Sequence, residues 1–93
     1  MPKAITVITN GKAVFPDYME GDISVFSFDN ESVGVWEKGL LYSLTDAVIN
    51  NYTVTGISNS FTGKESSISV KQGTLIIYYN GNPDDIKIGK NVV

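Results

Sequence analysis

The sequence predicts a mainly β fold, a small antiparallel β-sandwich or barrel of about eight short strands, with at most one short helix near residues 43–50. Turn-forming residues recur at short, regular intervals along the 93 residues. The runs between them are rich in Val, Ile, Phe and Tyr, and several alternate apolar with polar residues, as strands with one buried face do. A chain of this length builds one core, so we expect a single β-rich domain over residues 1–93.

The first two strands are expected on either side of Asn10-Gly11. Lys3–Ile8 is a β-branched run, and Ala13–Phe15 resumes the apolar pattern before Pro16. Asn-Gly between two such runs is the strongest short-range signal for a β-hairpin, because both central residues of a type I′ turn need a positive φ. Further strands are expected over residues 23–28, 33–36 and 40–44, and residues 37–39 are expected to form a second hairpin turn.

The segment at residues 43–50 carries a helical signal. Ser43 and Asp46 have the spacing of a capping box, and apolar residues at 40, 44, 47 and 48 fall at helical spacing. We therefore predict a short helix over residues 43–50. The alternative is a hairpin from Ala47–Ile49 to Tyr52–Ile57, turning at Asn50-Asn51.

The C-terminal third repeats the arrangement of an apolar run, a polar-polar-Gly turn and a second run. Ser66–Val70, Lys71-Gln72-Gly73 and Thr74–Tyr79 are expected to form a hairpin with Gly at the left-handed position. The run LIIYY at residues 75–79 is apolar on both faces, which indicates a central strand or one whose outer face meets a partner. Ile86–Ile88 is expected to be a short edge strand.

The predicted core consists of apolar side chains from several of the expected elements. Its members are Ile5, Val7, Val14, Val25, Phe26, Val35, Trp36, Leu44, Val54, Ile68, Val70, Leu75 and Ile77.

The amino-acid types that the chain lacks exclude several classes of function. The chain has no Cys and no His, so thiolate nucleophiles and the usual general base near neutral pH are excluded. All seven basic residues are lysines, spread along a chain of net charge −3, and we expect no direct binding of nucleic acid. No nucleotide-binding or nucleophile motif is present. We therefore predict a chain that is not an enzyme and that holds no cofactor and no metal.

Two segments are candidate sites for binding a partner. Tyr78 and Tyr79, with Ile76 before them, would form an aromatic patch at a strand end. The alternative is that one ring packs in the core and the other lies over a neighbouring strand. The segment at residues 15–22 mixes aromatic and acidic residues, and its candidates are Phe15, Asp17, Tyr18, Glu20 and Asp22.

These candidates have plainer structural alternatives as well. The aromatic residues of the segment at 15–22 would then cover the end of the core. Phe61, in a long polar loop, is a further partner-binding candidate, or else folds back as a plug. The Asn/Asp-rich residues 80–85 are expected to form a turn, since the spacing of a calcium loop is missing.

The whole profile is similar in a general way to small bacteriophage proteins, which include virion components and inhibitors of host systems. We predict a non-enzymatic assembly or interaction module, a small structural subunit of a phage-like particle that forms a homo-oligomer. The alternative is a small inhibitor that binds a host protein, and a third option is a small-ligand binder at a subunit interface. No apolar run spans a membrane and the N-terminus is no secretory signal, so we expect a location in the host cytoplasm or in a particle.

Overall fold

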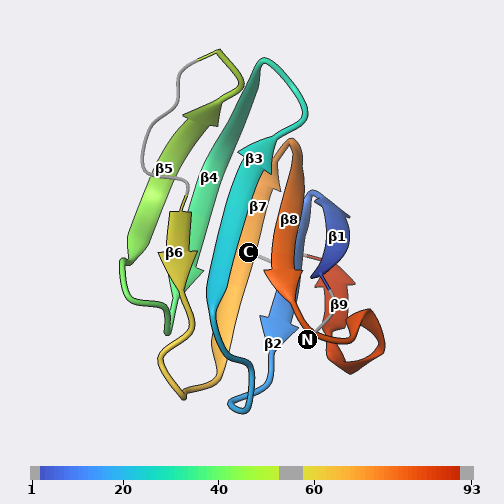
Figure 1. The fold of residues 1–93 in the computed structure, drawn as a ribbon. Coiled ribbons are helices and arrows are strands. Elements are labelled where there is room, and N and C mark those ends of the chain that lie inside the picture. The colour runs from blue at the N-terminus through green and yellow to red at the C-terminus, as the bar shows by residue number, and fades with distance from the viewer. Residues whose placement is uncertain (1–2, 53–57, 91–93) are drawn as a thin grey trace.

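Two antiparallel sheets pack face to face in the computed structural model, which describes residues 3–52 and 58–90 (Figure 1). The four-stranded sheet has the order β1 (Lys3–Thr9), β8 (Thr74–Asn80), β3 (Asp22–Ser27) and β6 (Ser58–Ser60). The five-stranded sheet has the order β5 (Leu44–Asn50), β4 (Glu31–Lys38), β7 (Ser66–Gln72), β2 (Gly11–Phe15) and β9 (Lys87–Lys90). Within residues 3–52 and 58–90 there is also one 3-10 turn, η1, over Pro83–Asp85. The predicted mainly β fold is confirmed.

Three of the turns at which the chain crosses between the sheets lie together at one end of the sandwich, and we call them the crossing turns (Figure 1). The turn at Asn10 joins β1 to β2, residues 28–30 join β3 to β4, and Gly73 joins β7 to β8. The hairpins predicted at residues 10–11 and 71–73 are therefore wrong, because the strands on either side of each turn belong to different sheets. Asn10 does adopt a positive φ of 45°, but Gly11 serves another purpose: a Cβ there would lie 2.7 Å from the Gly89 carbonyl oxygen of β9.

The predicted helix over residues 43–50 is also wrong. Leu44–Asn50 forms β5, which pairs antiparallel with β4 through pairs such as Val33 with Val48. This pairing satisfies backbone groups along the free edge of β4, which a helix would leave unpaired. The register shifts twice along the pair and Asp46 adopts a φ of 47°, so the strand is irregular and its apolar spacing resembles a helix. The alternative hairpin falls partly on residues 53–57, outside the described residues.

The core lies between the sheets, and about half of the predicted core set is in it. Val25, Val35, Ile68, Val70, Leu75 and Ile77 are fully buried, as predicted. Val14 and Leu44 are half-buried, and Val54 lies outside the described residues. The prediction is wrong for four residues that face solvent, which are Ile5, Val7, Phe26 and Trp36.

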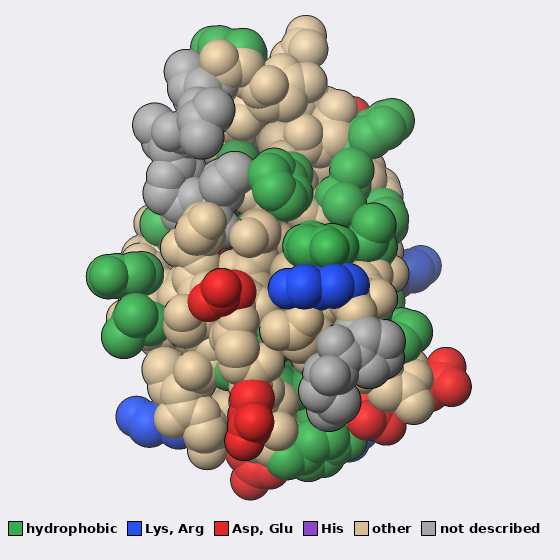
Figure 2. Space-filling view, viewed as in Figure 1, with side chains coloured by type: hydrophobic (Ala, Val, Ile, Leu, Met, Phe, Trp, Pro, Cys, Tyr) green, Lys and Arg blue, Asp and Glu red, His purple; other side chains and the backbone are tan. Residues whose placement is uncertain are grey.

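On the four-stranded sheet these wrong core predictions have one physical cause: the outer face of the sheet is apolar as well as the inner face. Ile5 pairs with Tyr78, and Val7 pairs with Ile76, so all four side chains share the outer face while Ile8 points inward. Figure 2 shows hydrophobic side chains gathered over β8 and β1 on this face. The prediction that LIIYY is a two-faced strand is thus confirmed in its geometry, and Ile88 lies in a short edge strand as expected.

Candidate binding site

The two adjacent tyrosines point to opposite faces of β8. Tyr79 is fully buried, its ring packs edge-on against Phe15 with 5.2 Å between centroids, and its hydroxyl bonds Thr6 Oγ1 at 2.7 Å. Tyr78 is on the outer face, where Lys3 Nζ lies 5.4 Å from its ring centroid. The structure therefore agrees with the alternative in which one of the two rings packs in the core. Tyr79 is that ring, and a partner cannot reach it. Tyr78 and the half-buried Ile76 remain open to one.

The segment at residues 15–22 closes one end of the core. Phe15 is fully buried and Met19 is 2% exposed, while Asp17, Glu20 and Asp22 face solvent. Tyr18 is exposed, and a hydrogen bond to the Asp85 carboxylate together with the nearby negative charge raises the pKa of its hydroxyl. This arrangement matches the alternative in which aromatic residues cover the core.

Phe61 packs with its ring centroid 5.7 Å from that of Phe15, so it acts as a plug at the same end of the core. A partner-binding role for the exposed members of the predicted set stays a prediction.

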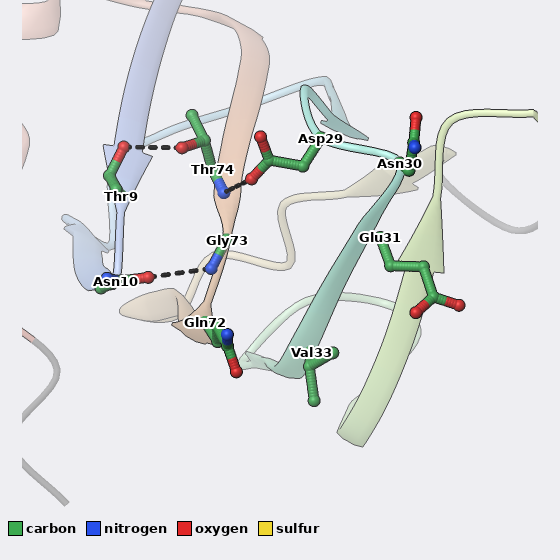
Figure 3. A pocket seen from close by; sticks show the side chains of 9 residues that line it. All are labelled: Thr9, Asn10, Asp29, Asn30, Glu31, Val33, Gln72, Gly73 and Thr74. Carbon is green, nitrogen blue, oxygen red and sulfur yellow. Dashed lines mark hydrogen bonds between the residues drawn. The ribbon is translucent and has the colours of Figure 1, made fainter.

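A polar pocket of about 500 Å³ lies among the three crossing turns (Figure 3). We call it the end pocket; its lining residues come from the three crossing turns, and they are Thr9, Asn10, Asp29, Asn30, Glu31, Val33, Gln72, Gly73 and Thr74. Several of its polar atoms are occupied by structural hydrogen bonds. Asn10 Oδ1 accepts from the Gly73 amide at 2.8 Å, and Asp29 Oδ2 accepts from the Thr74 amide at 3.0 Å. These side chains hold the turns together.

A second polar cluster lies under the connection between β4 and β5, at the other end of the sandwich from the crossing turns (Figure 1). We call residues 39–43 the Tyr42 loop. The side chain of Asn59, which is 5% exposed, holds this loop by its backbone. Its Oδ1 accepts from the Tyr42 amide at 2.9 Å, and its Nδ2 donates to the Tyr42 carbonyl at 2.6 Å.

Further bonds tie the Tyr42 loop to β6 and the residues after it. The Leu41 amide donates to the Ser60 carbonyl at 3.0 Å, and Thr62 Oγ1 donates to the Gly39 carbonyl at 2.8 Å. Gly39 has a φ of 77°, and a Cβ there would overlap the Glu65 carbonyl oxygen. The backbone of the loop is therefore fixed, while the Tyr42 side chain is 65% exposed and that of Leu41 is 57% exposed.

Glu37 is the unusual member of this cluster, since its carboxyl group is buried between the sheets. The side chain is 1% exposed, and its Oε1 accepts from Asn59 Nδ2 at 2.9 Å. Its Oε2 is buried with no hydrogen-bond partner among the described residues. Burial raises the pKa of Glu37, and the hydrogen bond from Asn59 lowers it by less. Buried carboxyl groups with a perturbed pKa gather at functional sites.

The sequence did not single out Glu37, Tyr42 or Asn59. The sequence places Glu37 in an expected turn at residues 37–39 and Tyr42 within an expected strand over residues 40–44. The loop that contains Asn59 was noted as a place for binding, and that polar stretch was the only available signal. Among residues 3–52 and 58–90, no group of three or more Asp and Glu residues could hold a metal ion.

Comparison with known proteins identifies the family. A family model described as thiamin pyrophosphokinase, vitamin B1 binding domain, matches residues 12–75. The chain belongs to this family. Among curated proteins, no sequence matches.

Solved structures of thiamin pyrophosphokinases share the fold. The enzyme from Bacillus subtilis superimposes with a TM-score of 0.73 at 21% identity, over 86% of this chain and 38% of that one. The enzyme from Geobacillus thermodenitrificans superimposes with a TM-score of 0.73 at 18% identity, over 89% of this chain and 39% of that one. A family protein from Enterococcus faecalis gives 0.67 at 14% identity, over 86% and 37%. The chain thus spans less than half the length of these proteins.

Membership in this family corrects the functional prediction. A phage assembly subunit and an inhibitor of a host protein are both wrong, because the family is described as a domain that binds a vitamin. The prediction that the chain is not an enzyme is wrong as well, since the family is that of thiamin pyrophosphokinase, of which this chain matches the binding domain. No finding supports a location in a phage particle, and no helix among the described residues is long and apolar enough to cross a membrane.

The family match covers both polar regions of the molecule. Glu37, the Tyr42 loop and Asn59 all lie within the matched residues 12–75, and so do all the residues that line the end pocket except Thr9 and Asn10. The two regions differ in their side chains: the Tyr42 loop exposes an aromatic ring, and no aromatic side chain lines the end pocket.

Proposed function

We propose that this chain is the thiamine-binding part of a thiamin pyrophosphokinase and that it binds the vitamin at the Tyr42 loop. The observation that carries the proposal is the match of the vitamin B1 binding domain to residues 12–75. The transfer of pyrophosphate to the bound vitamin would then depend on the parts of such kinases that this chain does not span.

The chemistry of thiamine suits the exposed face of the Tyr42 loop. The vitamin has a positively charged thiazolium ring and a flat aminopyrimidine ring. An exposed tyrosine ring attracts a cation through its π face and stacks on a flat heterocycle, with each contact contributing ~1–2 kcal/mol. Leu41 adds an exposed apolar side chain beside it. The fixed backbone lowers the entropy lost on binding, since little of the loop remains to be ordered.

The end pocket is the competing site within the same function. It has a suitable volume and offers the carboxylates of Asp29 and Glu31 to a cation. Four of its side chains, those of Thr9, Asn10, Asp29 and Thr74, hold the crossing turns, and no aromatic side chain lines it.

Isothermal titration of thiamine into the purified protein tests the proposal. We expect saturable binding that weakens about tenfold in Tyr42→Ala, from the loss of one stacking contact. Tyr52→Ala is the matched control, because Tyr52 is also an exposed tyrosine, at 70%, and lies outside the loop. Absence of thiamine binding by the wild-type protein would reject the function. Binding that is equal in Tyr42→Ala and wild type would reject the site.

A further inference from the structure

We propose that Glu37 is a positioning residue for the vitamin: it orients the Asn59 amide, which in turn holds Tyr42 at the surface. This inference rests on the proposed function, because it deepens the account of the same site. It begins from a carboxyl group that is 1% exposed in a sandwich of only nine described strands. Such a group costs stability when buried, and retaining it calls for a use.

Glu37 faces inward from the five-stranded sheet, between Leu44 of β5 and Ile68 of β7 in the register. Asn59 faces inward from β6, in the other sheet. The hydrogen bond between Asn59 Nδ2 and Glu37 Oε1, at 2.9 Å, therefore joins the two sheets beneath the Tyr42 loop. It is the contact that links the buried carboxyl group to the exposed loop.

The Asn59 amide has only one orientation that satisfies its neighbours. Nδ2 donates to Glu37 Oε1 and to the Tyr42 carbonyl, while Oδ1 accepts from the amides of Tyr42 and Ser60. Rotation of the amide by half a turn would set Oδ1 against the Glu37 and Tyr42 oxygens, and Nδ2 against two N–H donors. All four contacts would become repulsive, so each one present reinforces the same orientation.

Without the Glu37 acceptor, one Asn59 donor is left buried and unpaired, and the preference for this orientation weakens. The consequence is transmitted to Tyr42, because Asn59 binds both its N–H and its C=O. Tyr42 then samples more positions, and a ligand must order the loop when it binds. Glu37 would therefore affect affinity without touching the ligand.

Two substitutions of Glu37 separate positioning from bulk stability. Glu37→Gln keeps an oxygen that accepts from Asn59, whereas Glu37→Leu keeps a similar size and removes the acceptor. Ser66→Ala is the matched control: Ser66 is 2% exposed, lies on the neighbouring strand β7, and its hydroxyl has no partner among the described residues. All variants are measured as the full chain at a temperature where each is folded.

The measurements are hydrogen exchange of the Tyr42 amide by NMR, without ligand, and thiamine affinity by calorimetry. We expect Glu37→Leu to speed exchange of the Tyr42 amide about tenfold and to weaken thiamine binding about tenfold, since the hydrogen bond from Asn59 to Glu37 is lost. Glu37→Gln should restore both values to within about twofold of wild type, and Ser66→Ala should leave both unchanged.

Wild-type exchange at Tyr42 in Glu37→Leu would overturn the inference, as would a Glu37→Gln variant that behaves like Glu37→Leu. If Glu37→Leu does not fold, Asn59→Asp takes its place, because it keeps the acceptor for the Tyr42 amide and loses both donors. The exchange experiment needs no ligand. A wild-type protein that binds no thiamine therefore rejects the proposed function, while the exchange data still decide whether Glu37 positions Tyr42.

Discussion

The two ends of the sandwich use their polar side chains differently. At the end that holds the crossing turns, Asn10, Asp29 and Thr74 bond to each other's turns, and the pocket lies among those turns. At the other end, Asn59 bonds a loop whose aromatic side chain stays exposed. The first arrangement uses its polar groups for closure of the fold. The second uses them to fix the backbone of the loop while its aromatic side chain stays exposed, as a binding site requires.

We expect the largest loss of stability from substitution of Asn59, and this substitution is the strongest test of the comparison between the two ends. Asn59→Leu removes partners from the amides of Tyr42 and Ser60 and from the Tyr42 carbonyl. Three backbone groups near the core then lose their bonds, and we expect the free energy of unfolding to fall by ~3 kcal/mol in urea unfolding. A loss below about 1 kcal/mol would show that the loop does not depend on this amide.

The next effect is expected at Gly73, in the end pocket. Gly73 has a φ of 132°, and a Cβ there would lie 2.6 Å from Ser32 Oγ and 2.9 Å from Ser32 Cα. Gly73→Ala should lower the free energy of unfolding by ~2 kcal/mol without changing thiamine affinity. Gly63→Ala is the control: it shares a positive φ of 80° but has nothing within 4 Å of the added Cβ. Weaker thiamine binding in Gly73→Ala would move the site towards the end pocket.

A smaller, pH-dependent effect is expected at Glu37. Burial raises its pKa above the ordinary value of 4.5, so the folded chain keeps this proton to a higher pH than the unfolded chain. The stability that Glu37 contributes is complete below pH 4.5 and is lost as the pH rises through the raised pKa. Glu37→Gln has no proton to lose at this position.

The free energy of unfolding of Glu37→Gln, relative to wild type, should therefore increase as the pH rises above 4.5 and through the raised pKa of Glu37. Urea unfolding of both proteins between pH 4 and pH 8 measures this difference. A difference that stays constant with pH would contradict the raised pKa of Glu37.

The smallest effect is expected at Glu31, which lines the end pocket. Glu31→Gln removes a negative charge that would attract the thiazolium cation if thiamine bound there. With the vitamin at the Tyr42 loop, calorimetry should give affinities for variant and wild type within about twofold of each other. A loss of tenfold or more would assign the vitamin to the end pocket.

The sequence predicted the features of the fold that depend on neighbouring residues. Alternation in Ser66–Val70 and the two-faced run at residues 75–79 both report on a local strand, and both are strands in the structure. The turn at Asn10 was located as well. Which strands pair across that turn depends on the packing of the two sheets, and this is why the hairpins at residues 10–11 and 71–73 were wrong.

The candidate site depends on contacts between distant residues, which a single sequence does not show. Asn59 lies 17 residues from Tyr42 and 22 from Glu37, and its burial follows only from the meeting of β6 with the Tyr42 loop. A contact with another strand also explains why residues 44–50 form a strand and not the predicted helix, since pairing with β4 determines their conformation. The missing Cys and His did exclude their own chemistry, but they gave no warning of a domain that belongs to an enzyme family.

The most direct test of the comparison is chemical-shift mapping of thiamine on the ¹⁵N-labelled protein. We predict that the largest shifts fall on residues 39–43 and 58–60, with residues 9–10, 29–31 and 72–74 nearly unchanged. Largest shifts at the crossing turns would contradict the assignment of the vitamin site to the Tyr42 loop.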